Sequence, residues 1–409
     1  MPNNDLVLTD GMRERMHDVY RHLHRNPELS MQEFRTAEFI EERLSALGVE
    51  HFRCGGTGVV GVVRNGDGPV VAFRADSDGL PIAEDTGFEY ASEATGRLED
   101  GTEVPVMHGC GHDTHVASLL AATEVFVSAP DAWTGTLVLI FQPGEETGAG
   151  ARAMVDDGLW DRAPRPAVVL GQHVMPGLAG TVQYPRGSAM SYADSWKVTL
   201  HGRQSHGSQP QDAIDPIVLG AHIVTRLQTV VSREIDAREA AVVTVGTFHA
   251  GLKENIIPAS AEFTLNIRTL DDAVRERVLA AVRRIITAEA SVSGAPEPVI
   301  EELYRFPRNF NDPEATDARM ADVAAELGAD AVTEVRPLMG SEDFGALATA
   351  IDVPSVYWFF GGYTAEQLEA DTVPVNHSPE FAPVMEPTLT TAVRAATAAI
   401  AGALGGAGV

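Results

Sequence analysis

The runs VVGVV at 59–63, VVAFR at 70–74, TLVLIF at 136–141 and AVVL at 167–170 decide the fold. Each run is short and almost free of polar residues, which is the pattern of strands buried on both faces. Helical patterns lie between several of these runs. We therefore predict an α/β domain whose sheet is covered by helices on both faces, with ligands bound beyond the carboxyl ends of the strands.

The first 48 residues are predicted to form two helices before this sheet begins. Met16, Val19 and Leu23 recur at helical spacing, and a second apolar series starts at Phe39. Pro27 separates the two series. At the other end of the chain, an Ala-rich helix is expected from about Pro387.

From about Gly187 the pattern changes, and a second domain is predicted. Its expected strands are WKVTLH (196–201), AVVTVGTF (241–248), AEFTLNIR (261–268) and PVIEEL (298–303). One helix that ends near Leu227 is expected after the first strand, and a second helix over 272–290 is expected before the last. The order β-α-β-β-α-β is that of a split, ferredoxin-like α+β unit. We predict an inserted domain over 187–301 and a discontinuous catalytic domain over 1–186 and 302–409.

Composition excludes several classes of partner. The chain has 409 residues, and 30 Lys plus Arg against 58 Asp plus Glu give a net charge of −28. Such a surface repels phosphate backbones and anionic membranes, so neither nucleic acid nor a membrane is an expected partner. The two cysteines, Cys54 and Cys110, make no disulfide framework, and no signal peptide or membrane span is evident, so a cytoplasmic location is expected.

The densest group of potential metal ligands is MHGCGHDTH at 107–115. Thiolate and imidazole both bind borderline-soft divalent metals, and glycines beside Cys110 and His112 allow the backbone to approach an ion closely. The alternative is that the histidines cap the following helix and the cysteine fills the core.

A second group is FQPGEETGAGA at 141–151, in which Glu145 and Glu146 follow an apolar strand. Adjacent carboxylates repel each other, and this cost falls if one binds a cation and the other transfers a proton. The alternative is a solvated turn.

Three further segments place polar side chains at strand ends or in loops. His173 follows the apolar run 167–170, Asp76 and Asp78 follow 70–74, and His377 lies in VNHSPEF. A single loop histidine is usually only a surface residue. Because four separate segments each offer metal ligands, the sequence favours a metal site with nearby carboxylates that orient its ligands.

Together these segments resemble the metallo-aminoacylase and carboxypeptidase family, in its subgroup of N-acyl amino acid amidohydrolases, hippurate hydrolases and auxin-conjugate hydrolases. The resemblance spans nearly the whole chain and rests on ordered motifs including RADSDGLPI, MHGCGHDTHVASLL, FQPGEETGAGARAMVDDG, HGRQSHGSQPQDAIDP, GSEDFG and NHSPEFAP. It implies two divalent metal ions per subunit, with zinc or manganese expected and cobalt or nickel as alternatives.

The resemblance also implies roles for individual residues. The metal ligands would be Cys110, His112, Glu146, His173 and His377. Glu145 would be the general base, and Asp78 would orient the site. A ligand role for Asp76 is doubtful, because related branches have a metal-binding histidine at that place.

In the inserted domain, the resemblance implies a dimer interface and a histidine, here His206, that stabilises the oxyanion of the substrate across the subunit boundary. Arg268 and Asn255 are the candidates for binding the α-carboxylate of a substrate, although Arg268 could equally pair within the small domain.

The expected activity is hydrolysis of the amide bond of N-acyl amino acids by a homodimer. The alternatives are a dipeptidase, an acetyl-diaminopimelate deacetylase or an acyl-glutamine hydrolase on the same scaffold, and a catalytically silent binding protein. A serine hydrolase is disfavoured because the chain has no GxSxG motif.

Overall fold

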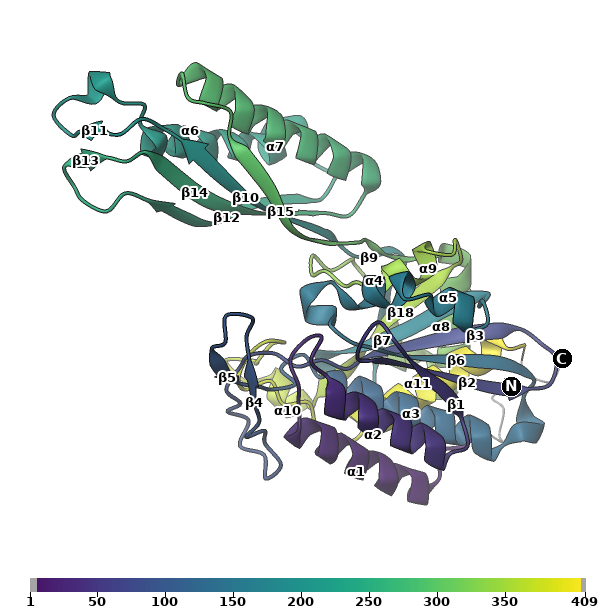
Figure 1. Cartoon of the computed structure of the whole chain (residues 1–409). Coiled ribbons are helices and arrows are strands. Elements are labelled where there is room, and N and C mark those ends of the chain that lie inside the picture. The colour runs from purple at the N-terminus through teal and green to yellow at the C-terminus, as the bar shows by residue number, and fades with distance from the viewer. Residues whose placement is uncertain (1–5, 406–409) are drawn as a thin grey trace. The chain divides into compact units, whose positions relative to one another are not determined.

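The computed structural model describes residues 6–405, which form two compact units (Figure 1). The first unit comprises the chain up to Ala189 together with Phe310–Arg336 and the segment from Asp343 onward. The second comprises Met190–Asn309 and Pro337–Glu342. The second unit extends past the predicted limit of 301 because strand β15 (Val299–Phe306) is longer than its apolar run, and no sequence pattern predicted the short segment 337–342.

The first unit is built on one mixed eight-stranded sheet. In spatial order its strands are β1 (Glu50–Cys54), β2 (Gly58–Asn65), β6 (Gly135–Gln142), β3 (Val70–Asp76), β7 (Val168–Leu178), β18 (Ser355–Tyr363), β8 (Val182–Pro185) and β17 (Val332–Val335). The central strands β6, β3, β7 and β18 are parallel neighbours, whereas β1 and β2 add antiparallel strands at one side. The four apolar runs of the sequence are β2, β3, β6 and β7, and the carboxyl ends of the parallel strands β3, β6 and β7 lie at one edge of the sheet.

Helices cover both faces of this sheet, as predicted. One face carries α1 (Asp10–Arg25), α2 (Phe34–Ala46), α3 (His112–Ser128), α8 (Pro313–Leu327) and α11 (Thr388–Ala403). Figure 1 shows the shorter helices α4 (Gly150–Asp156), α5 (Leu159–Arg162) and α9 (Gly345–Thr349) on the opposite face. Within residues 6–405, no helix is both long and apolar enough to cross a membrane.

Helix α3 lies at the centre of the first unit and is buried around most of its circumference. It packs against α1, α11 and the strands β3 and β7, so it needs no polar face. Its first residue is His112, and the preceding Gly111 has φ 79°. A Cβ at Gly111 would lie 2.3 Å from Val174 Cγ1, so only glycine fits the turn that positions this histidine.

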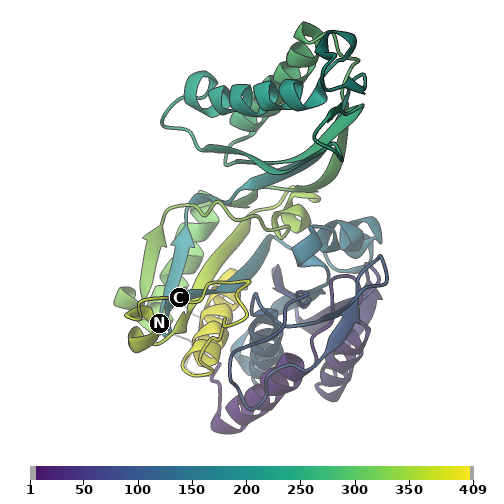
Figure 2. The same cartoon turned by 90° about the vertical axis from the view of Figure 1, so that its left-hand side faces the viewer.

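The second unit has the predicted ferredoxin-like order. Its antiparallel sheet runs β12 (Ala241–Ala250), β14 (Ser260–Thr269), β10 (Tyr192–His201) and β15. Helices α6 (Pro216–Thr229) and α7 (Asp272–Val292) lie side by side on one face of this sheet (Figure 2). A small separate two-stranded sheet pairs β11 (Ser205–His206) with β13 (Ile256–Ile257).

Candidate metal centre

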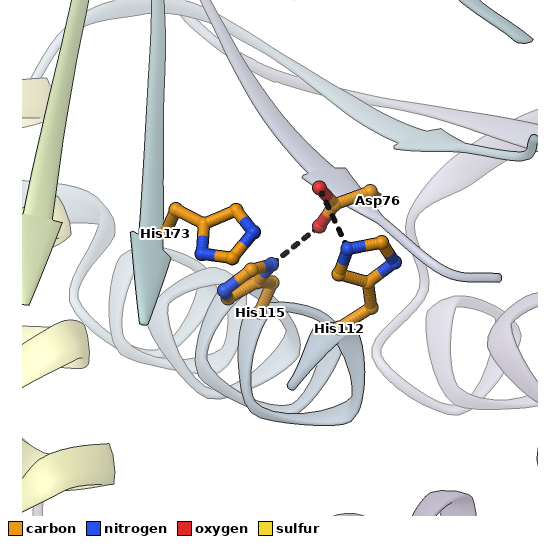
Figure 3. A group of neighbouring side chains, drawn as sticks. All are labelled: Asp76, His112, His115 and His173. Atoms are coloured by element: carbon orange, nitrogen blue, oxygen red, sulfur yellow. Dashed lines mark hydrogen bonds and ion pairs between the residues drawn. The ribbon is translucent and has the colours of Figure 1, made fainter. Parts of the chain in front are cut away.

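The polar side chains that the sequence places at strand ends meet at the carboxyl edge of the parallel strands. Asp76 is the last residue of β3, His112 begins α3, and His173 belongs to β7. Figure 3 shows these three side chains, together with His115 of α3, directed toward one another. All four are buried.

Cys110, His112 and Glu146 form the first group of potential ligands. One ligand atom from each lies within 4.8 Å of the other two. His112 Nε2 and Glu146 Oε1 are buried, lie 3.8 Å apart and have no hydrogen-bond partner. Buried polar atoms without a partner cost free energy, and a cation between them would satisfy both. These residues therefore fit a divalent metal ion.

Asp78 fixes the orientation of His112. Its Oδ1 lies 3.1 Å from His112 Nδ1, so Nδ1–H donates to the carboxylate and the lone pair of Nε2 is directed away from it. Burial lowers the pKa of His112, but Asp76 and Asp78 outweigh this effect and raise it well above its usual range. A cation at Nε2 would compensate the same carboxylates in place of the proton.

His173 is held by its own backbone. Its Nδ1 donates to Val174 O at 2.7 Å, which makes Nε2 the unprotonated nitrogen of the neutral ring, in hydrogen-bond contact with Cys110 Sγ at 3.5 Å. Burial, reinforced by the neighbouring His115, lowers the pKa of His173 well below its usual range. A neutral imidazole with a free nitrogen is the form that binds metals.

His377 reaches the site from a loop, where its backbone has φ 72° and its N–H donates to Gly109 O at 2.8 Å. Its Nε2 lies 3.3 Å from Glu146 Oε1. The neighbouring Cys110 thiol and Glu146 carboxylate raise the pKa of His377 to about 10. The structure thus brings together all five residues expected to bind metal, although they come from four separate segments.

Glu145 is buried, with 6% of its surface exposed. Its Oε2 is 3.9 Å from His112 Nε2, so the expected general base is beside the candidate metal position. Asp78, expected to orient the site, accepts hydrogen bonds from Ser30 Oγ at 2.6 Å and from Glu146 N at 3.0 Å.

Sequence reasoning missed a buried network beneath the candidate ligands. Asp76 accepts hydrogen bonds from Arg74 Nη1 at 2.7 Å and from His115 Nδ1, while His115 Nε2 accepts from Val174 N at 2.8 Å. Burial raises the pKa of Asp76, but Arg74 and the histidines lower it well below its usual range. Its carboxylate is therefore already compensated by protein groups. An arginine inside a buried strand was the signal in the sequence.

The expected substrate-binding residues of the second unit lie apart. His206 and Asn255 are neighbours at the two-stranded β11–β13 sheet, where Gly207 N donates to Asn255 O at 2.8 Å. Both side chains are exposed. Arg268 lies near the far end of β14, where it donates to Met339 O at 2.7 Å and Asn266 Oδ1 at 2.9 Å. The structure does not bring Arg268 to the other two.

Comparison with known proteins agrees with this geometry. The model of peptidase family M20/M25/M40 matches residues 72–401. The chain belongs to this family. Among M20 relatives, a thermostable carboxypeptidase 2 of Saccharolobus solfataricus is 36% identical over 89% of each chain. A hippurate hydrolase of Campylobacter jejuni is 38% identical over 80% of this chain and 83% of its own.

A solved M20 structure extends the comparison to the metal centre. The YXEP protein of Bacillus subtilis, described as a dinuclear metal-binding peptidase, is 28% identical over 96% of this chain and 99% of its own, with a TM-score of 0.76. The M20 architecture of a catalytic domain with an inserted lid domain is therefore that of the present chain. The protein is a hydrolase of amide bonds.

Proposed function

We propose that this M20 hydrolase cleaves the amide bond of N-acyl amino acids to release a free amino acid and a carboxylic acid. The observation that supports this most directly is the position of Glu145, whose Oε2 lies 3.9 Å from His112 Nε2, a buried ring nitrogen that forms no hydrogen bond. The hippurate hydrolase relative supports an acyl amino acid as the substrate class.

Five side chains would hold two divalent ions, namely Cys110, His112, Glu146, His173 and His377. When bound, such ions supply Lewis acidity, which polarises an amide carbonyl and lowers the pKa of water. A set of thiolate, imidazole and carboxylate accepts zinc or manganese, and also cobalt or nickel. We propose zinc or manganese as the metal in the active enzyme.

The protein's own groups would move the proton. Glu145 would take a proton from the attacking water and return it to the nitrogen of the leaving amine. Because Glu145 is nearly buried, little bulk water would reach its carboxylate, and the proton transfer would stay within the site. His206 would donate a hydrogen bond to the oxyanion that develops on the carbonyl.

A substrate α-carboxylate needs a local cation, because the protein has a net charge of −28. Arg268 is half-buried and has hydrogen bonds to Met339 O and Asn266 Oδ1, which leave part of its guanidinium for an anion. We propose Arg268 as the carboxylate-binding residue and Asn255 as a polar contact from the β11–β13 sheet.

The length of β14 supports a homodimer. Asn255 precedes the first residue of this strand, Ser260, whereas Arg268 is its last residue but one, and ten residues of strand span roughly 30 Å. One small substrate cannot contact both residues of the same chain, so we propose that His206 and Asn255 act in the site of a second copy. The edge strand β12 and helix α6 expose an apolar surface suited to such an interface, with Ile217, Val218, Val242 and Phe248.

The first experiment is an activity assay with metal-reconstituted protein on N-acetyl, N-benzoyl and long-chain N-acyl amino acids, with and without a chelator. Dipeptides belong in the same panel, because the carboxypeptidase relative suggests a peptide substrate. We expect chelator-sensitive release of amine from at least one acyl amino acid. Release from dipeptides alone would favour a peptidase, and no release despite two bound metals would contradict the proposal.

A cytoplasmic location is likewise proposed, from the scarcity of cysteine.

A further inference from the structure

Glu33 is a fully buried carboxylate for which the proposed reaction has no role so far. It lies just before α2, in the segment Ser30–Glu33. Its Oε1 accepts hydrogen bonds from Met31 N and Gly144 N, both at 2.8 Å, and its Oε2 accepts one from Thr57 Oγ1. Both carboxylate oxygens are therefore engaged by protein donors, which argues against a metal-binding role for Glu33.

The contact with Gly144 links Glu33 to the segment that holds the proposed general base. Gly144 N is bonded to Glu33, and Glu146 N is bonded to Asp78 Oδ2 at 3.0 Å. Glu145 lies between these two anchored peptide groups. Two buried carboxylates thus fix the backbone on either side of the residue that would transfer the proton.

The same segment is fitted closely to the turn at Gly144. Gly144 has φ 56°, and a Cβ placed on it would lie 2.6 Å from Met31 Sδ. Met31 itself has φ 61°, which is uncommon for a residue other than glycine, and its N–H is bonded to Glu33. Ser30 Oγ donates to Asp78, so both anchors of the Glu145 turn contact Ser30–Glu33.

We propose that Glu33 is a positioning residue for catalysis, which holds the Gly144–Glu146 turn so that the Glu145 carboxylate lies where the proton is transferred. The proposal rests on Glu145 as the general base. A misplacement of about 1 Å in such a group can cost about 10²-fold in rate. Glu33 acts through hydrogen-bond geometry, because its oxygens accept backbone and hydroxyl hydrogens and pair with no cation.

This geometry predicts an unusual order among conservative substitutions. Glutamine at 33 keeps Oε1 in place for both backbone amides, and its side-chain N–H can donate to Thr57 Oγ1 with the direction of that bond reversed. Aspartate keeps the charge but is one methylene shorter, so it cannot reach Gly144 N without moving the turn. A geometric role therefore favours Glu33→Gln, whereas a role of the charge would favour Glu33→Asp.

The experiment measures kcat, KM and metal content for Glu33→Gln, Glu33→Asp and Glu28→Asp on one acyl amino acid. Glu28 is the matched control, because it lies two residues before Ser30 and its Oε2 accepts hydrogen bonds from Thr36 N and Thr36 Oγ1 and not from the Glu145 turn. We expect kcat of Glu33→Asp to fall about 10- to 100-fold, with KM within about threefold and full metal content. Glu33→Gln and Glu28→Asp should each keep kcat within about threefold.

An unaltered kcat in Glu33→Asp, or a higher kcat in Glu33→Asp than in Glu33→Gln, would overturn the proposal. If Glu33→Asp does not fold, Thr57→Val removes one donor to Glu33 and should still lower kcat more than Glu28→Asp does, and an equal kcat would refute the positioning role. Glu145→Gln is measured in parallel. Its retention of activity would refute the proposed function itself, independently of Glu33.

Discussion

The two units present their polar residues in opposite ways. In the first unit, His112, His173, Asp76 and Asp78 are buried and oriented by hydrogen bonds to neighbouring protein groups. In the second unit, His206 is exposed on a two-residue strand, and its Nδ1 accepts a hydrogen bond from Ser208 N at 3.1 Å. The buried residues of the first unit are oriented by groups of that same unit, whereas the imidazole of His206 is exposed to solvent.

This difference separates preorganisation from recruitment. A buried, bonded group keeps its geometry without a ligand, and its disturbance affects both stability and chemistry. An exposed residue such as His206 contributes little to the stability of its own unit. Its substitution should therefore affect activity, which requires substrate and a second copy, and not stability. The following substitutions test that separation.

The largest effect is expected at the buried base. Glu145→Gln should lower kcat by about 10²- to 10⁴-fold, because proton transfer is lost while the amide preserves the shape of the side chain. Bound metal, measured by atomic absorption, should remain complete. Cys110→Ala provides the contrast, since it removes a proposed ligand and should lose metal. A Glu145→Gln enzyme with full activity would end the assignment of the base.

His206→Ala tests the exposed side of the comparison. Loss of one oxyanion donor should lower kcat by about 10²- to 10³-fold. The free energy of unfolding, measured in urea, should change by less than about 0.5 kcal/mol because the side chain is exposed. Destabilisation by several kcal/mol with normal kcat would show that His206 has a structural role in the β11–β13 sheet instead.

Arg268→Ala should act on binding. We expect KM for an N-acyl amino acid to rise about tenfold, which corresponds to about 1.4 kcal/mol of lost binding, with a smaller change in kcat. The control is the matching substrate whose carboxylate is replaced by a neutral amide, for which KM should not change. An unaltered KM for the acyl amino acid would leave Arg268 with only its contacts to Asn266 and Met339.

The smallest effect on activity is expected at His24, a buried histidine of α1 that is not a proposed ligand. Burial lowers its pKa, but hydrogen bonds to Asp113 at 2.7 Å and Glu84 at 2.9 Å outweigh this and raise the pKa to about 9. Because the folded pKa lies above the ordinary value of 6.5, the stabilisation is complete below about pH 6.5 and is lost as pH rises through about 9.

Urea unfolding of the wild type and His24→Gln checks this prediction. The difference in unfolding free energy between them should shrink by up to about 3 kcal/mol from pH 6 to pH 10. His17→Gln is the control, because His17 meets Glu386 at a partly exposed pair that contributes little. A difference that does not depend on pH would show that His24 is not charged in the folded protein.

Sequence reasoning captured what local patterns encode. The apolar runs gave the central strands, and the order of elements gave the ferredoxin-like unit. It missed strand β8 and its neighbour, the edge strand β17, which are four residues each and include exposed positions. Such strands are defined by their neighbours in space and not by their own composition.

The same limit applies to the site. Ligands were predicted because they cluster in motifs, but Glu33 and His115 were not assigned roles. Glu33 acts on Gly144 across 111 positions of sequence, and His115 bonds Val174 across 59. A glutamate before an amphipathic helix resembles an ordinary surface residue until the fold brings its partner to it.

Strand β14 also constrains how this protein can change in evolution. Successive residues of a strand point to opposite faces, so one inserted residue between Asn255 and Arg268 would turn Arg268 toward the face covered by α6 and α7. Two inserted residues would restore its face but shift it by about 7 Å. The composition of β14 can therefore drift, whereas its length is expected to stay fixed among enzymes that share this substrate.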